Sequence, residues 1–312
     1  MDYLDCRILV ELARDRNMTH AAQTLFLSQP ALTRRIKNLE REFGVPLVIR
    51  RSKGIAFTER GDRLLDAARK MLMDYEVLKS DLAAFQEGTV SGELRIGAIY
   101  VLLESVLPPL IASFASRCPE VAFQLVAQPN VKLFHGLYNG ELHLAFLREA
   151  YGWPERRVHL GSEPMYVVSK EPIDLADLPM LPRIDAVRNA KLNALLDAWW
   201  NERYRHPPRS LVRVSNSNIG LKLVSLGMGY AFVSESSLAN FGSGLFRTPM
   251  YDGRGQPVLR HTFLYYRNEV LRLRQAAAFL DFIEKTGLPP PSGAGGDREE
   301  PPGSLTGPGR GV

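Results

Sequence analysis

A basic segment near the N-terminus carries the side chains best suited to bind a polyanion. Between Ser28 and Lys53 there are seven basic and two acidic residues, whereas the whole chain of 312 residues has a formal net charge of only +5. Lysine and arginine gathered in one segment are typical of a surface that meets nucleic acid. A solvated helix face is the alternative, and it is the one that charge alone favours.

The residue types in and around this segment match the groups that DNA presents. Glutamine can pair with adenine and arginine with guanine, while threonine and proline can touch the methyl group of thymine. Four residues that would open a helix after Ser28 offer this chemistry: Gln29, Pro30, Thr33 and Arg34. Contacts to phosphate fix the position of a protein on DNA without distinguishing sequences. The residues placed for that role are Thr19, Arg35, Lys37, Arg50, Arg51 and Lys53.

These side chains need a scaffold that presents a helix and a loop to one surface. Apolar spacing and capping residues predict three helices, over residues 3–15, 19–25 and 28–43. Two β-prone runs at 47–50 and 55–58 follow, separated by a basic tip that contains glycine. Three helices followed by a hairpin form a winged helix-turn-helix, so we expect an all-α domain with a wing over residues 1–58.

A long helix is predicted over residues 59–86, with no glycine or proline after Gly61. Its apolar residues recur in two seven-residue series offset by four, the a/d pattern of a coiled coil. The expected seam is Leu64, Ala68, Met71, Tyr75, Leu78, Leu82 and Phe85. A helix of this length extends beyond a small domain, so we expect residues 59–87 to link the domains and to pair two copies of the chain. Packing of the helix on its own domain is the alternative.

Strand and helix patterns alternate from residue 88 to residue 287. Such alternation implies parallel sheets flanked by helices, and its length predicts an α/β domain of two lobes. Residues 288–312 are predicted to be a disordered tail, because 14 of the 26 residues from Gly287 onward are glycine or proline.

Ligands of open α/β sheets lie at the carboxyl ends of the strands, which makes the cleft between two lobes the expected ligand site. The residues in the corresponding loops are Ile99, Tyr100, Gln128, Asn130, Arg148, Ser215, Asn216 and Asn218. The last three flank a predicted helix start, where free backbone N–H groups favour an anion such as a carboxylate. An ordinary structural role at a strand end is equally compatible with each position.

The sequence gives little support for an enzyme, a metal-binding protein or a membrane protein. No nucleophile elbow, phosphate-binding loop or metalloprotease motif occurs, so we do not expect an enzyme. Six histidines without metal-ligand spacing and two cysteines predict no metal and no cofactor. The pair Trp199 and Trp200 is expected in a lobe core or at a subunit interface. The absence of a long apolar run or a signal sequence predicts no contact with a membrane and a cytoplasmic location.

The first 60 residues resemble the LysR-type family of bacterial transcription regulators. The resemblance is carried by the sequences MTHAA at 18–22, LSQPALTRRI at 27–36, LE at 39–40, FGVPL at 43–47, Arg50, FT at 57–58 and Gly61. Weaker similarity to the family's effector domain lies at LRIG (94–97), LP (107–108), GEL (140–142) and VSLGMG (224–229). The sequence departs from the family pattern before Arg50, where an aromatic and an acidic residue are usual, and at His143, where aspartate is usual.

This resemblance implies a regulator of transcription that binds double-stranded DNA and responds to a small-molecule effector. It also implies a C-terminal domain built like a type II periplasmic binding protein, and assembly as a dimer or a dimer of dimers. Gln29, Pro30, Thr33 and Arg34 match positions at which the family meets bases. RNA polymerase is a further candidate partner. The alternative function is a DNA-binding regulator whose sensor domain is degenerate and independent of any ligand.

Overall fold

The computed structural model describes residues 1–51, 54–87, 89–238, 241 and 244–288. The described residues form two compact units. The first comprises residues 1–164 and the C-terminal segment from Val258, and the second comprises residues 165–257. The predicted tail from 289 onward lies outside the described residues. No helix in the described part of the chain is both long and apolar enough to cross a membrane.

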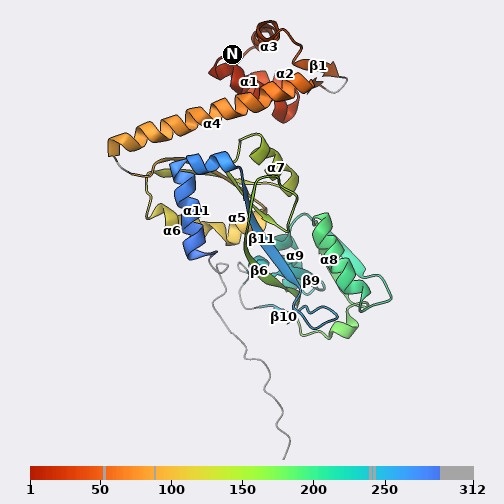
Figure 1. The fold of residues 1–312 in the computed structure, drawn as a ribbon. Helices are drawn as coiled ribbons and strands as arrows, with labels where there is room; N and C mark the ends of the chain where they lie inside the picture. The colour runs from red at the N-terminus through yellow and green to blue at the C-terminus, as the bar shows by residue number, and fades with distance from the viewer. Residues whose placement is uncertain (52–53, 88, 239–240, 242–243, 289–312) are drawn as a thin grey trace, which may run out of the picture. The chain divides into compact units, whose positions relative to one another are not determined.

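Three capped helices and a hairpin open the first unit (Figure 1). They are α1 (Tyr3–Asp15), α2 (Met18–Thr24), α3 (Gln29–Phe43), β1 (Val48–Arg51) and β2 (Gly54–Phe57). The two strands are antiparallel, with Val48 opposite Phe57. The buried faces of the helices meet in one apolar core that includes Leu9, Leu32 and Ile36. This arrangement is the winged helix-turn-helix that the sequence predicts.

The helix that follows, α4 (Glu59–Glu87), is continuous and packs against α1. Leu65 and Ala68 are buried in the core formed by α1, α2 and α3. Farther along, Met73 and Val77 are buried in the core of the next domain. One face of α4 therefore packs on its own chain along much of its length.

The remainder of the first unit is a sheet covered by helices. Its strands are β3 (Gly92–Ala98), β4 (Val121–Ala127), β5 (Leu144–Arg148), β11 (Leu259–Tyr266) and the first part of β6 (Arg156–Ser169). Strand β3 is parallel to β4 and β5, whereas β11 is antiparallel to both β5 and β6. The sheet is therefore mixed and not parallel as predicted, because β11 runs antiparallel to its neighbours between β5 and β6. The covering helices are α5 (Tyr100–Ser105), α6 (Leu107–Ala115), α7 (Asn130–Tyr138), η2 (Asn268–Arg272) and α11 (Arg274–Thr286).

The second unit contains the end of β6 together with β7 (Pro182–Ala186), β8 (Arg209–Val214), β9 (Ala231–Ser234) and β10 (Phe246–Pro249). Strands β9 and β10 are antiparallel to β6, and β7 is parallel to β8. Its helices are η1 (Leu175–Asp177), α8 (Ala190–Asn201), α9 (Ser217–Ser225) and α10 (Glu235–Leu238). Trp199 and Trp200 are buried on α8, as expected, and each indole N–H donates to a backbone carbonyl.

Candidate nucleic-acid interface and effector loops

The first two turns of α3 present polar and apolar side chains to solvent. Ser28 caps the helix by accepting a hydrogen bond from the backbone N–H of Ala31 at 3.3 Å. Gln29, Pro30 and Arg34 are exposed and Thr33 is half-buried, whereas Leu32 and Ile36 on the opposite face are buried. The capped start of α3 therefore brings the four predicted base-reading residues together on the surface of the domain.

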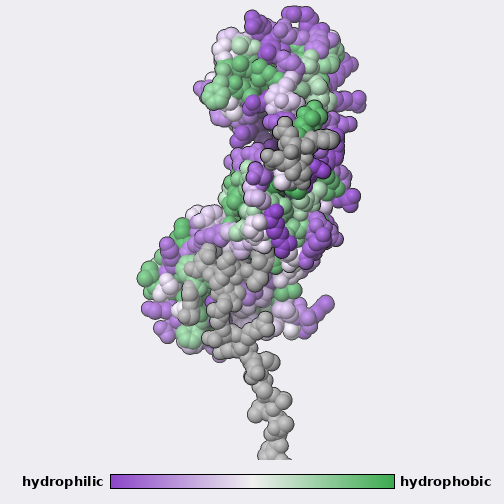
Figure 2. All heavy atoms as spheres, turned by 90° about the vertical axis from the view of Figure 1, so that its left-hand side faces the viewer, coloured by the Kyte–Doolittle hydropathy of each residue, from purple (hydrophilic) through white to green (hydrophobic). Residues whose placement is uncertain are grey.

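Two neighbours extend this surface. The Thr19 hydroxyl of α2 donates to the Gln29 side-chain oxygen at 3.4 Å, so it orients the amide of Gln29. Phe26, in the turn between α2 and α3, has a φ of 56° and a ring that is 96% exposed. A left-handed backbone is uncommon for an aromatic residue, and sequence patterning did not single this position out. Figure 2 shows that hydrophilic residues predominate over this upper part of the molecule, with a smaller hydrophobic area among them.

The predicted phosphate-binding residues have different environments. Thr19, Lys37, Arg50 and Arg51 are exposed, and Lys53 lies outside the described residues. Arg35, in contrast, donates to Asp2 at 2.8 Å and to Asp5 at 2.7 Å. These hydrogen bonds raise the pKa of Arg35 and lower that of Asp2.

The guanidinium of Arg35 holds the start of α1 against α3 in the folded chain. Its contact with phosphate stays a prediction. The signal that sequence analysis missed is the spacing of Asp2 and Asp5, which together form a capping box at the start of α1.

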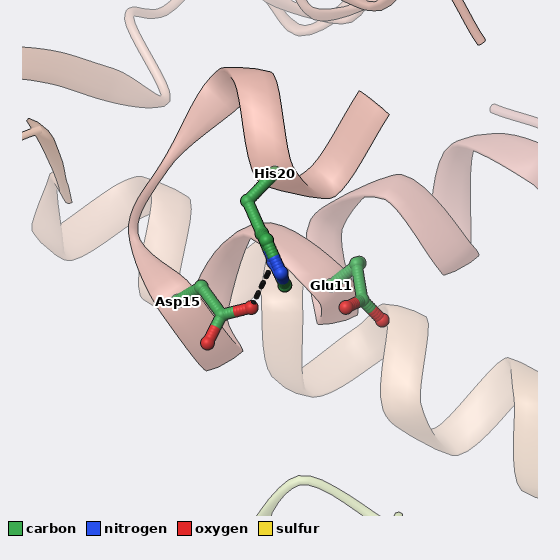
Figure 3. Close-up of side chains that lie close together, drawn as sticks. All are labelled: Glu11, Asp15 and His20. Carbon is green, nitrogen blue, oxygen red and sulfur yellow. Dashed lines mark ion pairs between the residues drawn. The ribbon is translucent and has the colours of Figure 1, made fainter. Parts of the chain in front are cut away.

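Three ionisable side chains meet where α1 passes into α2 (Figure 3). Asp15 and His20 form an ion pair, with Oδ2 and Nδ1 2.5 Å apart. Glu11, one turn before Asp15, has its carboxylate near the same imidazole, and potential ligand atoms of all three residues lie within 4.8 Å of one another. Sequence spacing had not indicated this grouping, because His20 follows a turn. The pair holds the start of α2 on the end of α1.

Helix α4 has a second, exposed face. Met71, Tyr75, Leu78 and Leu82 are each about half exposed, at 48%, 47%, 53% and 58%. Ala68 is fully buried by its own domain, so no partner helix can reach it, and Leu64 is partly buried there. Phe85, the last residue of the predicted seam, is not among the residues whose side chains the structure describes. The stripe that a second chain could cover is thus shorter than the predicted seam, and we call these four residues the α4 stripe.

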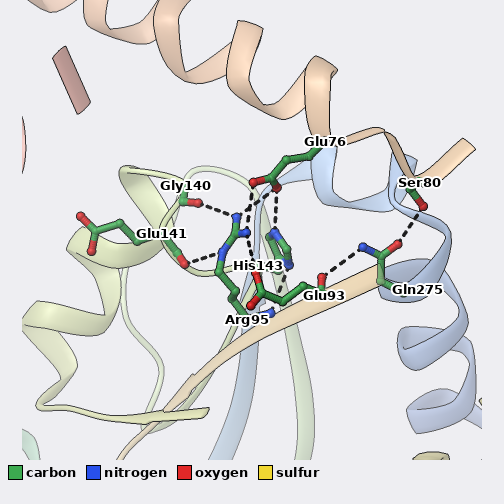
Figure 4. A network of polar contacts seen from close by, with 8 residues as sticks. All are labelled: Glu76, Ser80, Glu93, Arg95, Gly140, Glu141, His143 and Gln275. Atoms are coloured by element: carbon green, nitrogen blue, oxygen red, sulfur yellow. Dashed lines mark hydrogen bonds and ion pairs between the residues drawn. The ribbon is translucent and has the colours of Figure 1, made fainter. Parts of the chain in front are cut away.

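The opposite face of α4 is fixed by polar contacts (Figure 4). Arg95 on β3 donates to Glu76 through both terminal nitrogens and to the backbone carbonyls of Gly140 and Glu141. His143, only 1% exposed, lies beneath this pair, with Nε2 3.3 Å from Glu76 Oε2. Burial alone would raise the pKa of Glu76, but hydrogen bonds from His143 and Arg95 outweigh it and hold the pKa at about 2.

The effector-loop residues of the first unit fall into two groups. Tyr100 is 54% exposed, Ile99 and Gln128 are half-buried, and Asn130 donates to the Tyr151 hydroxyl at 2.8 Å. Arg148 is buried, and its guanidinium lies 2.5 Å from Glu163. Burial lowers the pKa of Arg148 to about 10. The side chain is enclosed with Glu163, and its contact with an effector stays a prediction.

The predicted residues of the second unit lie at the start of α9. Asn216 is the N-cap, and its side-chain oxygen accepts from the backbone N–H of Ile219 at 3.0 Å. That oxygen caps the helix, and a contact between Asn216 and an effector stays a prediction. Ser215, one residue before the cap, is exposed, and Asn218 is half-buried in the first turn.

Comparison with known proteins agrees with this architecture. Residues 87–287 match the LysR substrate binding domain, and residues 4–62 match the bacterial regulatory helix-turn-helix protein of the lysR family. The uncharacterized HTH-type transcriptional regulator YraN of Bacillus subtilis (strain 168) is 29% identical over 284 residues, which cover 91% of this chain and 98% of that protein. The DNA-binding transcriptional dual regulator OxyR of Escherichia coli (strain K12) is 34% identical over 188 residues, 59% of this chain and 61% of that protein.

Solved structures show the same fold. A full-length variant of OxyR from Pseudomonas aeruginosa aligns with a TM-score of 0.65 at 21% identity, covering 96% of this chain and 99% of that one. Full-length CbnR complexed with its target DNA aligns with a TM-score of 0.58 at 21% identity, covering 91% and 99%.

The fold and the exposed start of α3 thus define a transcription regulator with an N-terminal DNA-binding domain. The chain belongs to the LysR family of DNA-binding transcriptional regulators, and its C-terminal α/β domain is the substrate-binding domain of that family.

Proposed function

We propose that α3 enters the major groove and that Gln29, Pro30, Thr33 and Arg34 read bases there. The observation that carries this proposal is the exposure of Gln29, Pro30 and Arg34 on a helix start whose opposite face is buried. Thr19, Lys37, Arg50, Arg51 and Lys53 would contact phosphate on either side, which fixes register. Family membership supports DNA as the partner, and the roles of individual residues follow from their chemistry.

The chain would bind DNA as a dimer or a dimer of dimers. The exposed α4 stripe supports this, since four large apolar side chains on one helix face are unusual without a partner. Two copies related by a two-fold axis would bind an interrupted site with two half-sites. RNA polymerase is the further partner that a regulator at a promoter would meet. This role places the chain in the cytoplasm, as a regulator and not as an enzyme.

A small-molecule effector would control the regulator by binding to loops of both lobes of the C-terminal domain. Support comes from the family of that domain and from exposed Tyr100 and Ser215 in the two units. The second candidate is a regulator with a degenerate sensor. A thermal-unfolding screen of metabolites separates the two, because a ligand that binds the folded state raises the unfolding temperature. Carboxylated and aromatic compounds come first in that screen.

The domain boundaries remain part of this proposal. They are 1–58 for the winged helix-turn-helix, 59–87 for the linking helix, 88–287 for the effector-binding domain and 288–312 for the tail.

Selection from random DNA tests the proposed binding mode. The full-length chain is mixed with duplexes that carry a long randomised segment, and bound duplexes are amplified and sequenced. We expect an inverted repeat whose half-sites are a whole number of helical turns apart. Enrichment of single half-sites would contradict the paired mode, and the absence of enrichment would contradict sequence reading.

A further inference from the structure

Two histidines and a serine meet on the exposed face of β6 and β11. Ser162 lies directly opposite His261 in the antiparallel pairing of these strands. The pairing then shifts by one residue, so that Phe263 lies opposite His159. This shift is a β-bulge that leaves Leu160 unpaired and turns His159 to the face that carries Ser162 and His261. Without the bulge, Leu160 would occupy that place.

The three side chains are linked through one hydroxyl. Ser162 Oγ lies 2.6 Å from Nδ1 of His261 and 3.2 Å from Nε2 of His159. The two imidazole rings have their centres 5.5 Å apart. One nitrogen of each ring therefore faces the same hydroxyl. Ser162 and His159 are exposed to solvent.

This arrangement has the dimensions of a metal site. Zinc binds imidazole nitrogen at about 2.0–2.1 Å, which separates neighbouring ligand atoms by about 3 Å and the centres of two bound rings by about 5–6 Å. The ring separation and the two contacts to Oγ match these values. Imidazole is the ligand that zinc, nickel and copper prefer among the side chains present here.

The charged residues that neighbour the cluster along the strands form ion pairs with other residues. Glu163 pairs with Arg148 at 2.5 Å, and Glu149 pairs with Arg260 at 3.1 Å. The guanidinium of Arg157 lies over the ring of Phe263, 5.6 Å from its centre. These carboxylates are held by arginines, so the ligand atoms that the cluster itself offers are the two imidazole nitrogens and the serine oxygen.

We propose that His159, Ser162 and His261 form a binding site for a divalent transition-metal ion of the zinc, nickel and copper class. The two imidazole nitrogens are the main ligands, the serine oxygen is a weaker third ligand, and water completes the coordination. The site lies close to the boundary with the second unit on both strands, shortly before Pro164 in β6 and shortly after Val258 at the start of β11. A bound ion would clamp β6 to β11 at this place. The inference does not depend on the proposed DNA contacts or effector.

Zinc titration of the full-length chain tests the site. The wild type and the variants His159→Ala and His261→Ala compete for Zn²⁺ with a chromophoric chelator at neutral pH. Two controls are essential: His20→Ala removes the imidazole next to Glu11 and Asp15, and His206→Ala removes another exposed histidine. Thermal unfolding with a chelator present verifies that each variant folds.

We expect one zinc site in the wild type, with affinity at least about tenfold weaker in His159→Ala and in His261→Ala. Even the loss of a residue that only hydrogen-bonds to a metal ligand lowers metal affinity by about 10- to 100-fold. Both controls should keep the wild-type affinity. The proposal is overturned if the wild type binds no zinc, if neither β-strand variant weakens binding, or if only His20→Ala does.

Discussion

Glu76 and Arg95 form a two-pronged ion pair that fastens α4 to β3. Arg95 Nη1 lies 3.1 Å from Glu76 Oε1, and Nη2 lies 3.1 Å from Oε2. Glu76 belongs to the helix that leaves the DNA-binding domain, and Arg95 belongs to the sheet of the effector-binding domain. This pair is therefore a direct physical connection between the two domains within the first unit.

Removing the Glu76 charge should leave the half-enclosed Arg95 guanidinium without its carboxylate. We expect Glu76→Gln to lower the free energy of unfolding by about 1.5–3 kcal/mol, the range for hydrogen bonds to charged groups. Glu93→Gln is the matched control, because Glu93 lies 3.5 Å from the same guanidinium and is 54% exposed. Its effect should stay within about 0.5 kcal/mol. Urea unfolding measures the free energy of unfolding of both variants. An equal decrease in the two variants would argue against a special role for Glu76.

His143 should make stability depend on pH. Its Nδ1 accepts the backbone N–H of Arg95 at 3.2 Å, so in the neutral ring the proton is on Nε2 and is donated to Glu76. Burial is the main reason that the pKa of His143 is lowered, and the nearby Arg95 charge adds to it. The unfolded chain therefore binds a proton more readily than the folded one does.

The contribution of His143 is then complete above its ordinary pKa of about 6.5 and is lost as pH falls below it. Its slope can reach about 1.4 kcal/mol per pH unit. Glu76 stays ionised throughout, since its pKa is held at about 2. Urea unfolding from pH 7.5 to 5 should show this slope in the wild type and a shallower one in His143→Gln. The control His206→Gln should keep the wild-type slope. A wild-type slope in His143→Gln as well would show that His143 is not the source of the pH dependence.

The α4 stripe should pair two chains. Met71→Lys combined with Leu78→Lys would place unpaired charges in the contact, which is costly without a partner. Sedimentation should then report monomers and DNA titration a weaker complex, because two half-sites are no longer held together. Lys70→Glu, an exposed change on the same helix, should leave assembly intact. A dimer that survives the double substitution would place the contact elsewhere.

Ser215 should take the polar end of an effector. Removing one charge-assisted hydrogen bond is worth about 1.5–3 kcal/mol, or about 10- to 150-fold in affinity, so Ser215→Ala should weaken binding by that factor. Asn216→Ala should instead lower stability by about 1 kcal/mol through loss of the cap. Calorimetry with a compound found by thermal unfolding measures the affinity. Unchanged affinity in both Ser215→Ala and Tyr100→Ala would place the site elsewhere.

Local signals in the sequence predict the elements of the DNA-binding domain well. Ser28 and Gly44 bound α3 because caps act within one turn of the residues they satisfy. The four base-reading residues follow from that helix start and from the resemblance to the family.

Sequence patterns could not predict the contacts between residues that are far apart along the chain. Arg35 is on the helix face that meets Asp2, and Ala68 lies in the core of its own domain, although both fit an interface by spacing. Arg148 is enclosed with Glu163, fifteen positions away along the chain. The side-chain contact between His143 and Glu76 connects residues that are 67 positions apart in the sequence. Such pairings depend on how helices and strands pack, which no local pattern records.

Duplex titration of Arg34→Ala tests the central claim most directly. The wild type, Arg34→Ala and Arg51→Ala are titrated at several salt concentrations against the selected duplex and a scrambled one. Arg34→Ala should lose about 1–3 kcal/mol on the selected duplex and much less on the scrambled one, because it removes a base contact. Arg51→Ala should weaken both alike and flatten the dependence on salt. An equal loss on both duplexes for Arg34→Ala would contradict the account, since Arg34 would then contact only the DNA backbone.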